Sequence, residues 1–472
     1  MSSTPHGLGA QLALSLALYA EILKGKFSRW FGYLQSLPYT DVDIPVFWDL
    51  EMEIGPGSRR LEDGREALKW LRGTEVWKIL QKRSENNRNL IEELNDYYHE
   101  TAEMLILRHR DKISSQFPVT PTLHGFHRAY ALVSSRAFIV DAYHGLCMVP
   151  IADAFNHESP NHVHLESDYY VCPECGSLHE CVHDWDNPPT VLGIDLINTA
   201  HKAVAIADDE LESDLFMVSV TAVPSGVEVF NTYGETLTNA QLLTQYGFIL
   251  EANDNDTLTW DIYQLLHDHA SGGEQRSVVD IGALWKQLCP SDWSIVSRSG
   301  LVYFANADMN VITSPLTLNG DGKISHQMWL IVSLHALHRV GKSFRNETVP
   351  TLSCLRNLLS TQMILEVHLE RDETEGQVAG PIDSYDFDTK LLKELEELCQ
   401  LMIHLCADRK AKTAFSGTIP EVGEYFDTLS HEKPRTRMAV SLVLNELSLL
   451  DSCQIMWTGL LGMVRRVGEW VP

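Results

Sequence analysis

The hydrophobic periodicity of this chain changes twice along its 472 residues, and this change constrains the fold more than any other feature. Apolar residues recur at spacings of three and four over residues 10–37 and, with breaks, over 66–110, which predicts helices. Short β-rich runs alternate with turn residues between about 124 and 250, and helical spacing resumes after residue 256. We therefore expect an α+β chain in which helical segments flank a strand-rich centre.

The same patterns locate individual elements. Leu37-Pro38 is expected to end the first helix, and the polar run 86–89 to interrupt the second helical stretch. Strands are expected at residues 137–141, 146–149, 216–221 and 226–230. The strongest amphipathic helices are expected at 324–340, 352–369, 391–406 and 438–457, and an exposed loop at 371–380. One face of the third helix is expected to be core, through Leu391, Leu395, Leu398, Met402 and Leu405.

The charge of the chain bears on its partners. It has 37 lysines and arginines against 64 aspartates and glutamates, a formal net charge of −27. A surface this negative repels nucleic acid unless a basic patch overrides it, and the sequence has no run of lysines and arginines that would do so. Basic proteins are therefore the expected partners, and nucleic acid is not.

Neither a membrane span nor a secretion signal is expected near the N-terminus. The apolar run 12–20 is less than half of the roughly 20 residues that cross a bilayer, and no basic segment precedes it. Nine cysteines, an odd number, are scattered along the chain. Reduced thiols are expected, which favours a cytoplasmic or nuclear location.

Four short segments in the centre form an ordered pattern. They are Ser135-Arg136-Ala137-Phe138, the run 152–157 that ends in Asn156-His157, the run 226–234 that ends in Tyr233-Gly234, and the run 239–248 that ends in Tyr246-Gly247-Phe248. In order and spacing they resemble the SET-domain protein lysine methyltransferases, in the branch of the Rubisco large-subunit methyltransferase and the fungal ribosomal-protein lysine methyltransferases. One such segment would be weak support, whereas four in the family's order make a strong resemblance.

The resemblance implies S-adenosylmethionine as the cofactor and assigns five residues to its pocket. Asn156 and His157 match the pair that contacts the cofactor, partly through main-chain groups. Arg136 matches an arginine whose fixed charge could bind the methionine carboxylate. Tyr246 and Phe248 match aromatic walls of the adenine and lysine pockets.

Tyr233 matches the family's catalytic tyrosine, whose hydroxyl lies near the methyl group and helps to orient the lysine nitrogen. Methyl transfer from a sulfonium to an amine is an in-line displacement, so the protein must mainly align two reactants and exclude water. The lysine has an ordinary pKa of about 10.4 and must lose a proton before it attacks, and a neighbouring sulfonium cation lowers that pKa. The resemblance therefore implies catalysis without a strong protein base.

The N-terminus departs from the family's pattern. Family members carry a β-rich stretch with a Gly-x-Gly turn ahead of the first helices, and this turn holds the methionine end of the cofactor. Gly7-Leu8-Gly9 has the spacing but leads into a helix, and Gly55-Pro56-Gly57 lies within the helical stretch. We expect either an N-terminally truncated sequence or a form with a damaged cofactor site.

A second departure is the segment Cys172-Pro173-Glu174-Cys175, which is followed by His179, Cys181 and His183. A Cys-x-x-Cys knuckle places two thiolates within reach of one tetrahedral metal ion, and the next residues offer three more ligands. Two interpretations stay open, a structural zinc site and an exposed loop that binds no metal. A zinc-dependent hydrolase is disfavoured because no His-x-x-x-His helix accompanies the cysteines.

These observations lead to one main hypothesis and one alternative. In the main hypothesis residues 1–255 form a SET domain, with a helical insertion at about 10–130 and a Cys/His insertion at about 158–190, and residues 256–472 form an all-helical domain similar to the family's substrate-binding domain. Such a protein would methylate a lysine of a basic protein, often a ribosomal one, which the acidic chain would attract. The alternative is a non-catalytic interaction protein that kept the SET architecture and lost cofactor binding.

Overall fold

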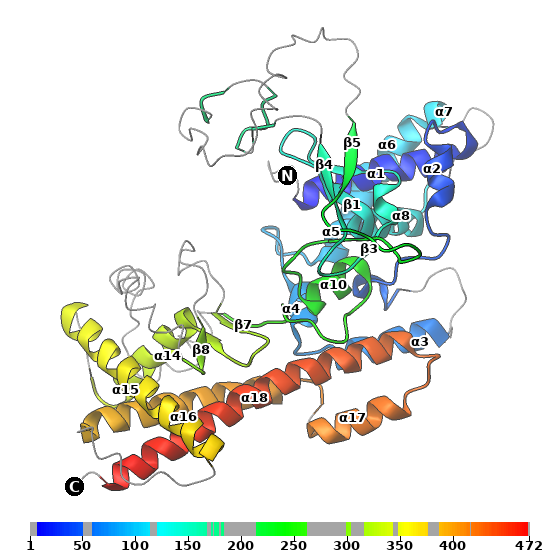
Figure 1. Ribbon diagram of the computed structural model, residues 1–472. Helices are drawn as coiled ribbons and strands as arrows, with labels where there is room; N and C mark the ends of the chain where they lie inside the picture. The colour runs from blue at the N-terminus through cyan, green and yellow to red at the C-terminus, as the bar shows by residue number, and fades with distance from the viewer. Residues whose placement is uncertain are drawn as a thin grey trace. The chain divides into compact units, whose positions relative to one another are not determined.

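A computed structural model describes the chain over residues 7–50, 59–113, 120–167, 171–172, 174–178, 181–183, 214–261, 299–303, 316–342, 348–375, 387–415 and 417–470. The chain divides into two compact units, and each is described by itself (Figure 1). The first comprises Met1–Phe47, Lys82–Leu237 and Thr244–Gly247, and the second Trp48–Gln81, Thr238–Leu243 and Phe248–Pro472. This division differs from a single boundary at residue 255, because residues 48–81 pack with the C-terminal helices.

The first unit has a helical core. Its helices are α1 (Leu8–Lys24), α2 (Phe31–Ser36), α5 (Leu90–Tyr97), α6 (Glu103–Arg108), α7 (Arg110–Ile113) and α8 (Leu123–Arg136). Buried Leu12 and Tyr19 of α1 belong to one apolar cluster with Phe126 and Tyr130 of α8. The two helices meet closely at Gly125, where an added Cβ would lie 2.7 Å from the Tyr19 hydroxyl.

The expected helices of the first unit form, but they are broken at specific residues. The continuous helix predicted at 10–37 is wrong, because Gly25 adopts φ +52 and ends α1, and α2 begins only at Phe31. The predicted interruption at 86–89 is confirmed, since Asn89 caps α5 and forms a capping box with Glu92. Gly7 caps α1, so the segment 7–9 leads into a helix as expected, whereas residues 55–57 lie outside the described residues.

Two sheets lie among the described residues of the first unit. β1 (Ala137–Ile139) pairs antiparallel with β2 (Leu146–Met148). A four-stranded sheet has the order β3 (Asn156–His157), β6 (Phe230–Asn231), β4 (Val163–Ser167) and β5 (Leu215–Ser219). The strands expected at 137–141, 146–149 and 216–221 are thus confirmed, but that at 226–230 is mostly wrong. Gly226 adopts φ +82 in a turn, and only Phe230–Asn231 pairs as a strand.

The second unit is mainly helical. Its helices are α3 (Arg59–Trp70), α4 (Glu75–Gln81), α14 (His326–Arg339), α15 (Thr348–Glu375), α16 (Thr389–Ala411), α17 (Ile419–Thr428) and α18 (Pro434–Trp470), while α10 (Asn239–Tyr246) is shared between the units. α16 and α18 pack against each other over much of their length (Figure 1). The predicted core face of α16 is confirmed, since Leu395, Leu398, Met402 and Leu405 are buried and Leu391 is partly buried.

Two C-terminal predictions need correction. Residues 256–472 are not all-helical, because they contain a four-stranded sheet. Its order is β7 (Leu258–Trp260), β9 (Leu316–Leu318), β10 (Ile324–Ser325) and β8 (Val302–Tyr303). Strands of two or three residues are too short to show an alternating pattern. The loop expected at 371–380 is wrong over 371–375, where α15 continues, because polar composition alone does not distinguish a helix from a loop. Residues 376–380 lie outside the described residues.

α18 is long and apolar enough to cross a membrane by length and composition, a test that core helices also pass. Its side chains Leu450, Cys453, Trp457 and Leu460 are buried in one cluster with residues of α16. Packing within the second unit therefore accounts for part of its apolar character, since 44% of its most apolar window is buried.

A buried ionic cluster joins α4, α16 and α18 of the second unit. Arg409 Nη2 lies 2.9 Å from Glu75 Oε1, and the backbone N–H of Glu75 donates to Glu446 Oε1 at 2.8 Å. The hydroxyl of Thr259 also donates to Glu75, at 2.7 Å. Burial raises the pKa of Glu446 to about 8, opposed by the nearby charge of Arg409.

Candidate functional site

The guanidinium of Arg136 is held at the end of α8, where the helix gives way to β1. Arg136 Nη1 donates to the backbone carbonyl of Asp153 at 2.8 Å and lies 3.5 Å from its carboxylate. Tyr33 of α2 donates its hydroxyl to the same carboxylate at 2.8 Å. Burial and the charge of Asp153 raise the pKa of Tyr33, so its hydroxyl stays protonated and remains a donor. Asp153 therefore connects two helices that are distant in sequence.

A tight turn places Asp153 in this position. Residues Ala152–Ala154 form one 3₁₀ turn. The residue before it, Ile151, adopts φ +72, and its side chain is exposed. A left-handed conformation is costly for a β-branched residue. The local backbone is thus strained beside the Arg136–Asp153 contact, as is common at functional sites.

Tyr233 lies in an aromatic stack that follows β6. Its ring stacks on that of Tyr246 at a centroid distance of 4.5 Å and on that of His157 at 5.2 Å. Its hydroxyl donates to the backbone carbonyl of Phe155 at 3.2 Å, and its backbone N–H donates to His157 Nδ1 at 3.1 Å. The tyrosine is therefore fixed at both its backbone and its hydroxyl.

The protonation states of this stack limit its chemistry. Burial raises the pKa of Tyr233 above its usual value and that of Tyr246 to about 12, so both hydroxyls are neutral near pH 7. Burial lowers the pKa of His157, whose Nδ1 already accepts a hydrogen bond, so its proton lies on Nε2. The site offers neutral hydrogen-bonding groups and aromatic rings. The Tyr233 hydroxyl can take part in hydrogen bonds but does not act as a base at neutral pH.

Asn156 and His157 lie on β3, which pairs in parallel with β6 so that His157 is opposite Asn231. The exposed Asn156 side chain donates to Glu228 Oε1 at 2.6 Å. The short β3–β6 pairing therefore brings the second and third of the predicted segments together, although they are about 70 positions apart in the sequence.

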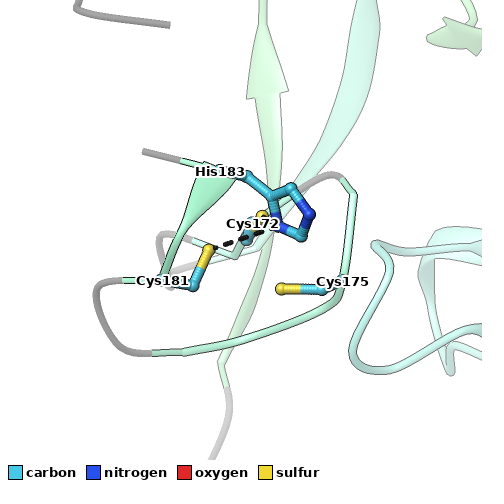
Figure 2. Close-up of side chains that lie close together, drawn as sticks. All are labelled: Cys172, Cys175, Cys181 and His183. Atoms are coloured by element: carbon cyan, nitrogen blue, oxygen red, sulfur yellow. Dashed lines mark hydrogen bonds between the residues drawn. The ribbon is translucent and has the colours of Figure 1, made fainter. Parts of the chain in front are cut away.

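The cysteine-rich segment also converges on one point. Four side chains point toward one another, those of Cys172, Cys175, Cys181 and His183 (Figure 2). Their sulfur and nitrogen atoms all lie within 4.8 Å of one another. Backbone N–H groups of Cys175 and Glu174 lower the pKa of the Cys172 thiol to about 7. The fifth ligand predicted from the sequence, His179, lies outside the described residues.

Solved structures provide the first comparison. The chain is similar to the structure of Rubisco LSMT bound to AdoMet, with a TM-score of 0.50 and 16% identity over 97% of this chain and 76% of that chain. It is also similar to the SET domain of LSMT bound to MeLysine and AdoHcy, with a TM-score of 0.51, 16% identity and the same shares covered. This chain has the SET-domain fold of LSMT. The expected fold class, with a β-containing SET unit and a helical C-terminal region, is confirmed.

Sequence relatives agree with this assignment of the SET fold. Ribosomal lysine N-methyltransferase 3 of Saccharomyces cerevisiae is 35% identical over 27% of this chain and 29% of its own length. N-lysine methyltransferase setd6 of Xenopus laevis is 26% identical over 56% of this chain and 46% of its own length. The chain thus spans less than half the length of these relatives, and no family model matches it. The resemblance to SET-domain protein lysine methyltransferases of this branch is confirmed.

Most of the residues predicted for the site lie in the first unit. Arg136, Tyr233 and Tyr246 all belong to this unit, as do Asn156 and His157, while Phe248 belongs to the second unit. Their roles stay predictions.

Two further residues of the first unit, Asp153 and Tyr33, were not predicted from the sequence. Asp153 lies in the run 152–157 together with Asn156 and His157, so its carboxylate was available as a signal. Tyr33 lay in a helical apolar pattern that gave no sign of its polar contact with Asp153.

Proposed function

We propose that this protein is an S-adenosylmethionine-dependent protein lysine N-methyltransferase. The main support is the stack of Tyr233 with Tyr246 and His157 in a chain with the SET-domain fold. Two relatives are named lysine N-methyltransferases, and the similar solved structures are bound to AdoMet or to AdoHcy and MeLysine.

The residues present suit the cofactor. When bound, S-adenosylmethionine supplies an electrophilic methyl group on a sulfonium cation. The rings of Tyr233 and Tyr246, which stack on each other, form an aromatic wall, and aromatic rings attract cations. Arg136 makes two contacts with Asp153 while its guanidinium carries five N–H donors, so it retains donors for a carboxylate.

The neutral hydroxyl of Tyr233 has an orienting role in this proposal. Because that hydroxyl donates to the carbonyl of Phe155, its oxygen lone pairs can accept a hydrogen bond from a substrate amine. The aromatic rings beside it limit the access of water and hold the line of approach. The raised pKa of Tyr233 means that the lysine proton leaves to another acceptor, in agreement with a site without a strong base.

The proposed substrate is a lysine in a basic protein, with ribosomal proteins as the first class to test. The formal net charge of −27 favours encounter with a basic segment, and one relative is named a ribosomal lysine N-methyltransferase. A cytoplasmic or nuclear location would suit such a substrate. Incubation with labelled S-adenosylmethionine and a ribosomal-protein extract should label a few bands, and methyl-lysine should be found in them. If only a parallel incubation with non-ribosomal basic proteins became labelled, the ribosomal substrate class would be overturned and the lysine chemistry would stand.

Asn156→Ala is expected to raise the Kd for S-adenosylmethionine at least ~10-fold, about 1.4 kcal/mol, as measured by isothermal titration calorimetry. The free energy of unfolding without cofactor should change by no more than about 1 to 2 kcal/mol, because the lost hydrogen bond to Glu228 is exposed. Asn86→Ala, at an exposed turn of the same unit, is the matched control and should bind as the wild type does. An unchanged Kd in Asn156→Ala would show that residues 156–157 serve only the strand pairing. No binding by the wild type would favour a non-catalytic SET-like interaction protein.

A further inference from the structure

We infer that Cys172, Cys175, Cys181 and His183 form a structural zinc site, an inference that does not depend on the proposed methyltransferase activity. His183 Nδ1 lies 3.8 Å from Cys172 Sγ and 3.6 Å from Cys181 Sγ. Around a tetrahedral zinc with Zn–S of about 2.3 Å and Zn–N of about 2.0 Å, neighbouring ligand atoms are about 3.5 to 3.8 Å apart. The two measured distances therefore match the edges of a zinc coordination tetrahedron.

The backbone around the first two cysteines forms the knuckle that such a site needs. The N–H of Gly176 donates to the carbonyl of Cys172 at 2.9 Å, and the N–H of Cys172 donates to the carbonyl of Ser177 at 2.9 Å. Gly176 adopts φ +72, which a residue with a side chain adopts only with strain. This turn directs both thiols of the Cys-x-x-Cys segment to the same side (Figure 2).

The ligand set favours zinc and a structural role. Three thiolates and one imidazole are soft and borderline ligands, which select zinc over magnesium or calcium. Four protein ligands fill a tetrahedron and leave no position for water, as in structural and not catalytic zinc sites. No disulfide links any of the described cysteines, so the cluster is not explained by a covalent cross-link.

The site has a structural task within the first unit. It lies in the segment between β4 and β5, and its knuckle packs on the turn between β1 and β2. A Cβ added at Gly176 would lie 2.7 Å from the carbonyl oxygen of Ala142. In the same turn, the Asp141 carboxylate accepts from the backbone N–H groups of Tyr143 and His144 at 2.9 and 2.7 Å. Zinc would therefore hold the β4–β5 insertion against the β1–β2 turn.

Elemental analysis of the full chain, expressed with added zinc, tests the inference. We expect about one equivalent of zinc per chain. Removing an outer-shell partner of a metal ligand already costs about 10- to 100-fold in affinity, so Cys181→Ser and His183→Ala should each weaken zinc binding at least ~100-fold in competition with a chelator. His183→Cys, which restores four ligands, should retain the zinc.

Two variants serve as controls. Cys147→Ser removes a half-buried thiol of β2 outside the cluster and should leave the zinc content unchanged. His179→Ala should also retain the zinc, because four other ligands complete the tetrahedron. Loss of zinc in Cys147→Ser, a stoichiometric iron content, or a chain that neither carries zinc nor takes it up after reduction would overturn the inference.

A second readout needs no variant. Replacement of zinc by cobalt(II) in the wild-type chain should give the visible ligand-field absorption of a tetrahedral thiolate site, whereas octahedral cobalt would contradict it. Removal of the metal should raise hydrogen exchange at residues 172–183 and at Asp141–His144, but not in α1 and α8. Unchanged exchange at the β1–β2 turn would refute the proposed structural task.

Discussion

Tyr233→Phe is expected to reduce the rate of methyl transfer by about 100-fold or more, equivalent to about 2.7 kcal/mol of transition-state stabilisation. The substitution removes only the hydroxyl that donates to the carbonyl of Phe155 and keeps the ring stacked on Tyr246 and His157. Steady-state kinetics should therefore show a loss in kcat with little change in the Kd for S-adenosylmethionine. The circular dichroism spectrum should be unchanged.

Tyr39→Phe is the matched control for this substitution. Tyr39 belongs to the same unit and is 86% exposed, so loss of its hydroxyl should leave kcat unchanged. Near-wild-type turnover in Tyr233→Phe would remove this hydroxyl from the mechanism. An equal loss in both variants would show that the effect is not specific to the stack.

Arg409→Met is expected to lower the free energy of unfolding of the second unit by about 3 to 5 kcal/mol. Methionine has a similar length and can fill the space, but it removes the guanidinium that lies 2.9 Å from the buried carboxylate of Glu75 and leaves Lys78, at 2.8 Å, as its nearest cation. Breaking a buried ion pair by removal of one partner is costly because the remaining charge is less well compensated. Urea unfolding, with hydrogen exchange of α16 and α18 as a local probe, measures the effect.

Arg465→Met provides the comparison for a surface pair. Arg465 contacts Glu396 at 2.9 Å with more than half of its side chain exposed, so its loss should cost no more than about 1 kcal/mol. If both arginine variants had the same small effect, the buried cluster would contribute no more to stability than a surface ion pair.

The sequence predicted best those features that depend on neighbours along the chain. The spacing of Leu395, Leu398, Met402 and Leu405 predicted the buried face of α16, because helical periodicity is a local property. The sequence spacing likewise singled out Cys172, Cys175, Cys181 and His183, whose side chains converge in the structure, while His179 of the same prediction lies outside the described residues. Local breaks were less visible, since Gly25 interrupts an otherwise continuous apolar pattern.

Contacts between distant residues could not be predicted from periodicity. Tyr33 and Asp153 are 120 positions apart, and Glu75 and Arg409 are 334 apart, so only tertiary packing brings them together. The stack of Tyr233 on Tyr246 was also unforeseen, although the resemblance had assigned both residues to one pocket. The short strands β7 to β10 were missed because each has only two or three residues.

Transfer of a deuterated methyl group from S-adenosylmethionine to a lysine is the direct test of the proposed activity. The purified chain is incubated with the deuterated cofactor and a basic protein substrate taken from the labelled bands, and the product is fragmented by mass spectrometry. We predict a mass increase equal to the deuterated methyl group on a lysine side-chain nitrogen, absent when the chain is omitted and strongly reduced with Tyr233→Phe. Modification of another residue type, or no label above the control without protein, would contradict the proposal that this chain is a lysine methyltransferase.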